Sequence, residues 1–271
     1  MKYLLLLITT FLFTLQILPA QNKLLFTPLS ANVFEPRVGA MYQFDDEKLR
    51  LDIGTSVDLL EIYKNDNSEI RFGTDFFTFT RLRSEGRLKF PVETSDYFFG
   101  VNFSNKFKYN GLDMSSRLRV AHISSHLVDG LSDEGKFDKM PFVYSREFID
   151  FVLAADIKGF RPYAGVNFVF STQPKDVNTL IPQFGLEFPV KTLKTATKDF
   201  LELKLSYDFK LGGNEHKYLP IHSVQVSCLF LTWEKMGVSL NVNGYTGPSM
   251  HGMFYRDIDR YISTGFQIIF Y

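Results

Sequence analysis

Residues 114–127 read MSSRLRVAHISSHL, and the two faces of this segment differ in the way that a β-strand explains. One face carries the apolar Leu118 and Val120. The opposite face carries Arg117 and Arg119, since successive side chains of a strand point to opposite sides. Near the end of the segment the apolar face becomes polar, with the order His122, Ser124, His126. We therefore expect a strand that is apolar on one side and charged on the other, with a polar cluster near its end.

The same alternation recurs along the chain, for example in Leu201–Leu211, LELKLSYDFKL. It predicts twelve strands, at residues 37–44, 49–62, 70–80, 97–109, 113–126, 145–157, 160–171, 181–190, 200–211, 222–233, 236–246 and 260–271. In the third of these, Phe76, Phe77 and Phe79 break the alternation, which predicts a β-bulge there.

The chain begins MKYLLLLITTFLFTLQILPAQ, the pattern of a secretory signal peptide. Lys2 supplies the positive start, and Leu18-Pro19-Ala20 is a plausible cleavage site. The alternative is a retained membrane anchor, but the apolar run of about 15 residues is shorter than the roughly 20 that a spanning helix needs. We expect a signal peptide at residues 1–20 and one domain at 21–271.

Connection lengths favour a barrel over other β-folds. Short connections at Asn110-Gly111, Lys158-Gly159 and Glu234-Lys235 alternate with longer ones at 81–96, 127–144, 172–180 and 247–259. Outer-membrane barrels have short turns at the periplasmic end and longer loops outside. The sequence therefore predicts an all-β, antiparallel, up-and-down transmembrane β-barrel of about twelve strands, in the outer membrane of a bacterium with two membranes. A soluble β-sandwich is the alternative, because its strands also have one apolar face.

Composition narrows the function classes. The formal net charge is +0, so charge provides no argument for binding nucleic acid, and outer-membrane lipids are the expected partners. The single cysteine, Cys228, excludes an internal disulfide. Charges of both signs on the inward faces predict a cross-linked, poorly conducting lumen, although a narrow polar pore is an alternative.

Several segments resemble an uncharacterised family of outer-membrane barrels, domain of unknown function 1207. The similarity covers nearly the whole mature chain and is carried by residues 24–37, 96–104, 122–130, 144–154, 161–174, 183–189 and 247–266. The resemblance implies a barrel and brings no activity with it.

A second, local resemblance is to outer-membrane phospholipase A, a twelve-stranded barrel with a His-x-Ser pair on the lipid-facing side of a strand. His122-Ile123-Ser124 has that spacing. The Asn that follows the Ser in that enzyme has no counterpart here, because no Asn occurs between Asn110 and Asn167. The resemblance implies a phospholipase, or lipid-ester hydrolase, that acts at the outer leaflet.

The residues themselves allow this chemistry. Residues i and i+2 of a strand share a face at about 6.5–7 Å between Cα atoms, so His122 can take the proton of the Ser124 hydroxyl during attack on an ester. A third group must orient the imidazole, and Glu147 on the next strand is the candidate. If His126 pairs near Ser145, Ser124 falls opposite Glu147.

Other readings of this cluster stay open. Ser125 and His126 are further candidate site residues, and the whole cluster could simply mark the membrane surface of a structural barrel without activity. Metal binding by His122 and His126 is a weaker alternative, because the two are about 13 Å apart along the strand. The following loop is a candidate Ca²⁺ site through its acidic residues, Asp129, Asp133, Glu134 and Asp138.

Overall fold

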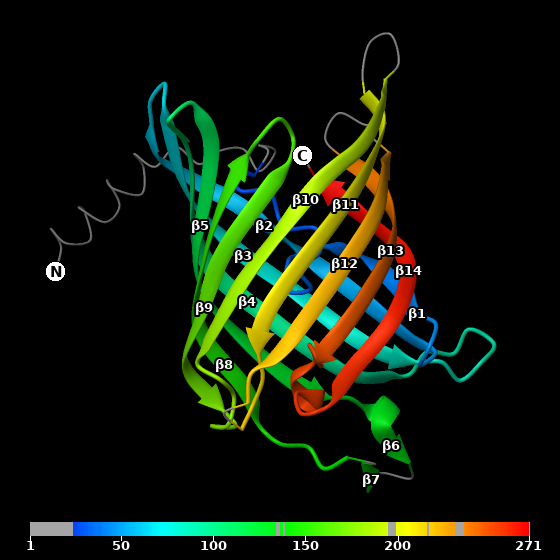
Figure 1. The fold of residues 1–271 in the computed structure, drawn as a ribbon. Helices are drawn as coiled ribbons and strands as arrows, with labels where there is room; N and C mark the ends of the chain where they lie inside the picture. The colour runs from blue at the N-terminus through cyan, green and yellow to red at the C-terminus, as the bar shows by residue number, and fades with distance from the viewer. Residues whose placement is uncertain are drawn as a thin grey trace, which may run out of the picture.

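Twelve antiparallel strands close into a barrel in the computed structural model, which describes residues 24–133, 136–137, 139–194, 199–215, 217–230 and 236–270 (Figure 1). The predicted signal peptide lies outside the described residues. The barrel strands are β1 (Val38–Gln43), β2 (Lys48–Lys64), β3 (Ser68–Arg83), β4 (Val92–Tyr109), β5 (Leu112–Leu127), β8 (Tyr144–Asp156), β9 (Arg161–Gln173), β10 (Leu180–Lys194), β11 (Asp199–Gly212), β12 (Leu219–Phe230), β13 (Met236–Pro248) and β14 (Ile258–Phe270).

The long connection between β5 and β8 contains a short separate sheet. It is formed by β6 (Ser132–Asp133) and β7 (Lys136–Phe137), and it follows the 3-10 turn η1 (Asp129–Leu131). A second 3-10 turn, η2 (Gly252–Phe254), lies between β13 and β14. Within the described ranges, no helix has the length and apolar character needed to cross a membrane.

Every barrel strand pairs with its neighbours along the chain, and β1 closes the barrel by pairing with both β2 and β14. This confirms the predicted up-and-down barrel of twelve strands and excludes the β-sandwich. The closure also explains why the sequence needs no charged edge strand, since a closed barrel leaves no unpaired backbone edge.

The two ends of the barrel differ in connection length, although the connection 44–47 is as short as 157–160 at the opposite end. The predicted short turn Glu234-Lys235 lies outside the described residues. One end carries the short connections 65–67, 110–111 and 157–160, together with the start of β1 and the end of β14. The other end carries the connections 44–47, 84–91, 128–143, 174–179, 213–218 and 249–257. By the rule for outer-membrane barrels, the second end is the outer end.

The bulge predicted at Phe76–Phe79 is wrong. Pairing continues without a shift from Gly73 to Arg81, and the nearest irregularities on the β2 side place the extra residues in β2, at Leu59 and Ile62. Phe76 points outward and is exposed, whereas Phe77 and Phe79 both point into the lumen and are buried. The alternation breaks because the lumen contains an apolar cluster, not because the strand is irregular.

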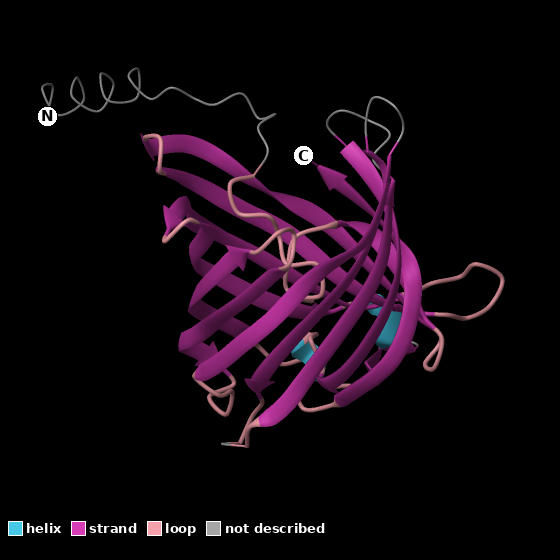
Figure 2. Cartoon of the chain, turned by 45° about the horizontal axis from the view of Figure 1, so that its top comes forward, coloured by secondary structure: helices cyan, strands magenta, loops and turns pink. Residues whose placement is uncertain are grey.

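The N-terminal segment, residues 24–37, lies inside this lumen (Figure 2). Its backbone is bound at opposite walls: Leu25 N donates to Asp58 on β2, and Ser30 N donates to Glu187 on β10. Leu29 is completely buried. The lumen of a twelve-stranded barrel is narrow, and side chains of the wall fill part of it. Residues 24–37 are therefore enough to occupy much of the remaining space.

Candidate functional site

The outer wall near the outer end carries an imidazole–carboxylate pair. His122 on β5 and Glu147 on β8 lie directly opposite each other in the sheet. The distance from His122 Nδ1 to Glu147 Oε1 is 2.8 Å, and the two side chains are 28% and 31% exposed. The sequence-predicted His and Glu therefore meet on the outside of the barrel.

The imidazole is held from its other side as well. Phe99 on β4 lies opposite His122, and the two rings stack with centroids 4.8 Å apart and an angle of 26° between their planes. A ring held between an aromatic face and a carboxylate has few other orientations. With Nδ1 directed at Glu147, Nε2 is the nitrogen left for another group.

Ser124 lies two residues further toward the outer end on the same face and is half-buried. Its partner across the sheet is Ser145, not Glu147, so the predicted register was wrong by two residues. The 128–143 connection is long enough to allow either pairing, and the actual pairing is the one that puts Glu147 beside His122. Among the described residues, Ser124 makes no side-chain hydrogen bond, and His122 and Ser124 are not bonded to each other.

A β-bulge on β9 adjoins the pair, and sequence reasoning did not identify it. Glu147 pairs with Ser171, but the next residue of β8, Phe148, pairs with Val169, so Phe170 is the extra residue. As a result Phe170 and Ser171 are both exposed on the outer wall beside Glu147. Bulges of this kind frequently redirect side chains next to active sites. In the sequence, the only sign of this bulge is that the apolar Phe170 is followed directly by the polar Ser171.

The two further candidate residues, Ser125 and His126, lie on opposite faces of the barrel wall. Ser125 points into the lumen, where it is buried and accepts a hydrogen bond from Met253 N at 3.1 Å. His126 is exposed on the outer wall, with its ring edge against Tyr97 at 5.7 Å between centroids. Only His126 therefore shares a face with His122 and Ser124.

Metal ligands are not brought together in the part of the chain that the structure describes. No group of three His, Cys, Asp or Glu side chains there could hold an ion. Of the acidic residues in the predicted calcium loop, Glu134 and Asp138 lie outside the described residues.

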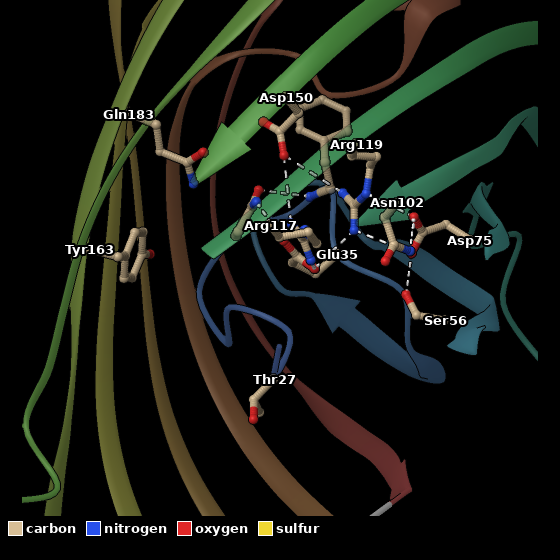
Figure 3. A network of polar contacts seen from close by, with 12 residues as sticks. Thr27, Glu35, Ser56, Asp75, Asn102, Arg117, Arg119, Asp150, Tyr163 and Gln183 are labelled. Carbon is tan, nitrogen blue, oxygen red and sulfur yellow. Dashed lines mark hydrogen bonds and ion pairs between the residues drawn. The ribbon is translucent and has the colours of Figure 1, made fainter. Parts of the chain in front are cut away.

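The inner face of β5 carries a network of ion pairs across the lumen (Figure 3). Arg117 Nη1 lies 2.8 Å from Glu35 Oε2 in the N-terminal segment, and Arg119 Nε lies 3.0 Å from Asp75 Oδ2 on β3. Asp150 on β8 lies 3.6 Å from Arg117 and 4.0 Å from Arg119. These contacts match the predicted cross-linked lumen, with the N-terminal segment as an additional bridge.

A second imidazole–carboxylate pair lies inside the barrel mouth. His251 Nδ1 in the last outer loop is 2.7 Å from Asp96 Oδ2 on β4, and their side chains are 2% and 0% exposed. Gly252 N also donates to Asp96, at 2.8 Å. His251 Nε2 is buried without a hydrogen-bond partner among the described residues. The pair fastens the loop into the mouth of the barrel.

At the outer surface, Asp176 joins two loops. Arg256 Nη2 lies 2.7 Å and the Tyr255 hydroxyl 3.0 Å from its carboxylate. Burial disfavours ionisation of Asp176, but the hydrogen bonds from Arg256 and Tyr255 outweigh it, so the pKa of Asp176 is lowered. Burial and the hydrogen bond to Asp176 raise the pKa of Tyr255 to about 12.

A closed barrel with an apolar outer wall, a charged lumen and alternating connection lengths is the architecture of bacterial outer-membrane β-barrels. The particular family is shown by sequence: the chain belongs to the family described as Protein of unknown function (DUF1207), which matches residues 16–270. This confirms the predicted family. No curated protein matches the chain.

Solved structures support the same fold. Outer membrane phospholipase A from Escherichia coli is similar with a TM-score of 0.54 and 11% identity, over 88% of this chain and 93% of that chain. The dimer of the Salmonella typhi outer membrane phospholipase with bound calcium has a TM-score of 0.54 and 11% identity, over 93% of this chain and 95% of that chain. At this identity the likeness shows the fold.

Proposed function

We propose that this protein is a lipid-ester hydrolase of the outer membrane, with Ser124 as nucleophile, His122 as general base and Glu147 as the residue that orients His122. The observation that carries the proposal is the 2.8 Å contact from His122 Nδ1 to Glu147 Oε1 on the lipid-facing wall, with Ser124 two residues along on the same face. The fold likeness to an outer-membrane phospholipase supports the same reaction class.

The depth of the site suits a lipid ester. Ser124 is three residues from the end of β5, which corresponds to about 10 Å along the strand. Exposed aromatic side chains lie beside and below it on the wall, Tyr97 and Phe99 on β4 and Phe168 and Phe170 on β9. A carboxylate on the lipid side is costly at mid-membrane and tolerated near the headgroups, so Glu147 also supports a position of this level close to the interface.

The proposed reaction moves one proton at a time. His122 keeps its Nδ1 hydrogen, which is hydrogen-bonded to Glu147, and takes the Ser124 proton on Nε2 to become an imidazolium, while Ser124 Oγ bonds to the carbonyl carbon of the ester. The ester C–O bond then breaks, and His122 returns the proton to the leaving alcohol oxygen. Water attacks the acyl-serine in the same way, which releases the fatty acid and restores Ser124. Glu147 stabilises the imidazolium that forms in both halves.

The proposal assigns no step to a metal. The similar Salmonella typhi structure is described with bound calcium, but the described residues of this chain offer no group of three His, Cys, Asp or Glu ligands. The assay described below is therefore run both with and without Ca²⁺.

The narrow-pore alternative is less well supported, since residues 24–37 occupy the lumen and bridge opposite walls. The other alternative is a structural barrel without activity. It is the interpretation that remains if the following experiment detects no hydrolysis.

The test is fatty-acid release from phospholipid vesicles by the refolded protein, with and without Ca²⁺. Ser124→Ala should lower the rate by about 10³-fold or more. Ser116→Ala is the matched control, because Ser116 lies on the same outward face of β5 near its other end. Wild-type protein that releases no fatty acid, or a Ser124→Ala variant as active as Ser116→Ala, would overturn the proposal.

A further inference from the structure

Arg146 on β8 is a lumen-facing cation without an anionic partner in the described chain. It lies between Ile123 of β5 and Thr172 of β9 in the sheet. Its guanidinium carbon lies 5.5 Å from the centre of the Phe34 ring and 5.7 Å from that of Tyr144. It makes no hydrogen bond or ion pair with any described residue, and its Nε is buried and unpartnered.

The other arginines of the lumen contrast with it. Each of the following pairs lies within 3.0 Å: Arg50 with Asp52, Arg117 with Glu35, Arg119 with Asp75, and Arg161 with Glu187. Arg146 is part-buried, so its guanidinium loses part of its hydration, and a carboxylate partner normally offsets such a loss. Arg146 has only aromatic rings in this role.

A cavity of about 40 Å³ adjoins Arg146. Three cations and one carboxylate line it, Arg119, Arg146, Lys210 and Asp150, so its polar lining carries an excess of positive charge. Asp150 is already close to Arg117 and Arg119, and Lys210 already contacts Asp208 at 2.7 Å. Asn167 also lines the cavity and makes no side-chain hydrogen bond to the described residues.

We propose that this cavity binds a small oxyanion, a carboxylate or phosphate group, through the guanidinium of Arg146 with Asn167 as a second donor. The rings of Phe34 and Tyr144 lie near the guanidinium and leave N–H groups available to two oxygens of one anion. A cavity of this size holds a few water molecules, so the ligand is a small anion and not an intact phospholipid. The site is on the lumen side of the barrel and is independent of the proposed wall chemistry.

Isothermal titration calorimetry of the refolded full chain with inorganic phosphate, and separately with acetate, in chloride-free buffer tests the proposal. The two probes distinguish a phosphate ligand from a carboxylate ligand. Wild-type protein should bind at least one of them saturably at one site. Arg146→Gln should weaken that binding by about tenfold or more, because it removes the charged donor.

Arg87→Gln is the matched control, since it removes one positive charge from an exposed loop, and it should bind like wild type. Asn167→Ala is a second variant that leaves the Arg146 charge in place. It should fold and bind more weakly, which keeps the test decisive if Arg146→Gln does not fold. No saturable binding of either anion by wild type, or binding that both cavity variants leave unchanged, would refute the site.

Discussion

His122 and His251 both direct Nδ1 at a carboxylate, at 2.8 Å from Glu147 and 2.7 Å from Asp96, yet the two pairs lie in opposite environments. The His122 pair is part-exposed on the outer wall and has Ser124 on the same face. The His251 pair is buried in the barrel mouth. Under the proposed function, the outer contact positions a base for chemistry, whereas the inner contact fastens a loop, and the two differ in access to a substrate.

The neighbours of each pair sharpen this contrast. Phe99 and the bulged segment at Phe170 border the outer pair, so an acyl chain in the leaflet could approach it. Phe79 and the backbone of Gly252 enclose the inner pair, and no lipid can reach His251 Nε2 without opening the loop. We therefore expect catalytic effects from the outer pair and stability effects from the inner one.

The largest expected effect separates the two histidines in activity. His122→Ala should lower fatty-acid release by about 10³-fold, because it removes the proposed general base. His251→Ala should retain the rate per folded molecule within about twofold, because its ring cannot reach the wall. Rates of both variants on phospholipid vesicles check this, and an equal loss in both would show that the contrast is wrong.

The next effect is on stability and concerns the inner pair. Asp96→Ala should lower the free energy of unfolding by about 3 kcal/mol, since it leaves the His251 imidazole and the Gly252 N–H buried without their acceptor. Urea unfolding of the protein in lipid vesicles measures this. The comparison variant is Glu147→Gln on the exposed pair, which should change stability by less than about 1 kcal/mol. A larger loss in Glu147→Gln than in Asp96→Ala would reverse the assignment.

Two substitutions of Glu147 should reduce the rate of hydrolysis to different extents. Glu147→Ala should reduce hydrolysis by about 10²-fold, because the imidazole loses both its orientation and a negative partner. Glu147→Gln should reduce it less, by about tenfold, since a side-chain oxygen remains to accept from Nδ1. The ratio of the two rates is the measurement, and full activity in Glu147→Ala would remove Glu147 from the site.

The smallest expected effect concerns the outer loops and pH. The pKa of Asp176 is lowered in the folded protein, so its contacts with Arg256 and Tyr255 stabilise the loops above the ordinary carboxyl pKa. That contribution is lost as the pH falls through the lowered pKa, in the range below about pH 4. Pepsin cleavage of the loops should therefore increase on acidification in wild type. Asp176→Asn should be cleaved faster already at about pH 5, and identical pH profiles would contradict the assignment.

Local pattern was sufficient for most of the architecture. Alternation in segments such as Leu201–Leu211 depends only on residues two apart, and it located all twelve strands. The connection lengths told the two ends of the barrel apart. The sequence predicted that His122, Ser124 and Glu147 share one site, but not that His122 lies directly opposite Glu147. The predicted register between β5 and β8 was wrong by two residues. A connection of this length does not fix a register, whereas closure of the whole barrel does.

The sequence by itself determined the outward face of His122 and Ser124 and the presence of opposite charges in the lumen, because each depends on side-chain parity along one strand. It also determined the barrel, because the connection lengths between successive strands alternate. Only the tertiary structure decided that residues 24–37 lie inside the lumen, that Phe77 and Phe79 face inward, and that His251 meets Asp96. Those contacts join residues far apart in the chain, such as Asn32 and Lys210. No local periodicity encodes them, since they form only when the closed wall brings its inner faces around a single segment.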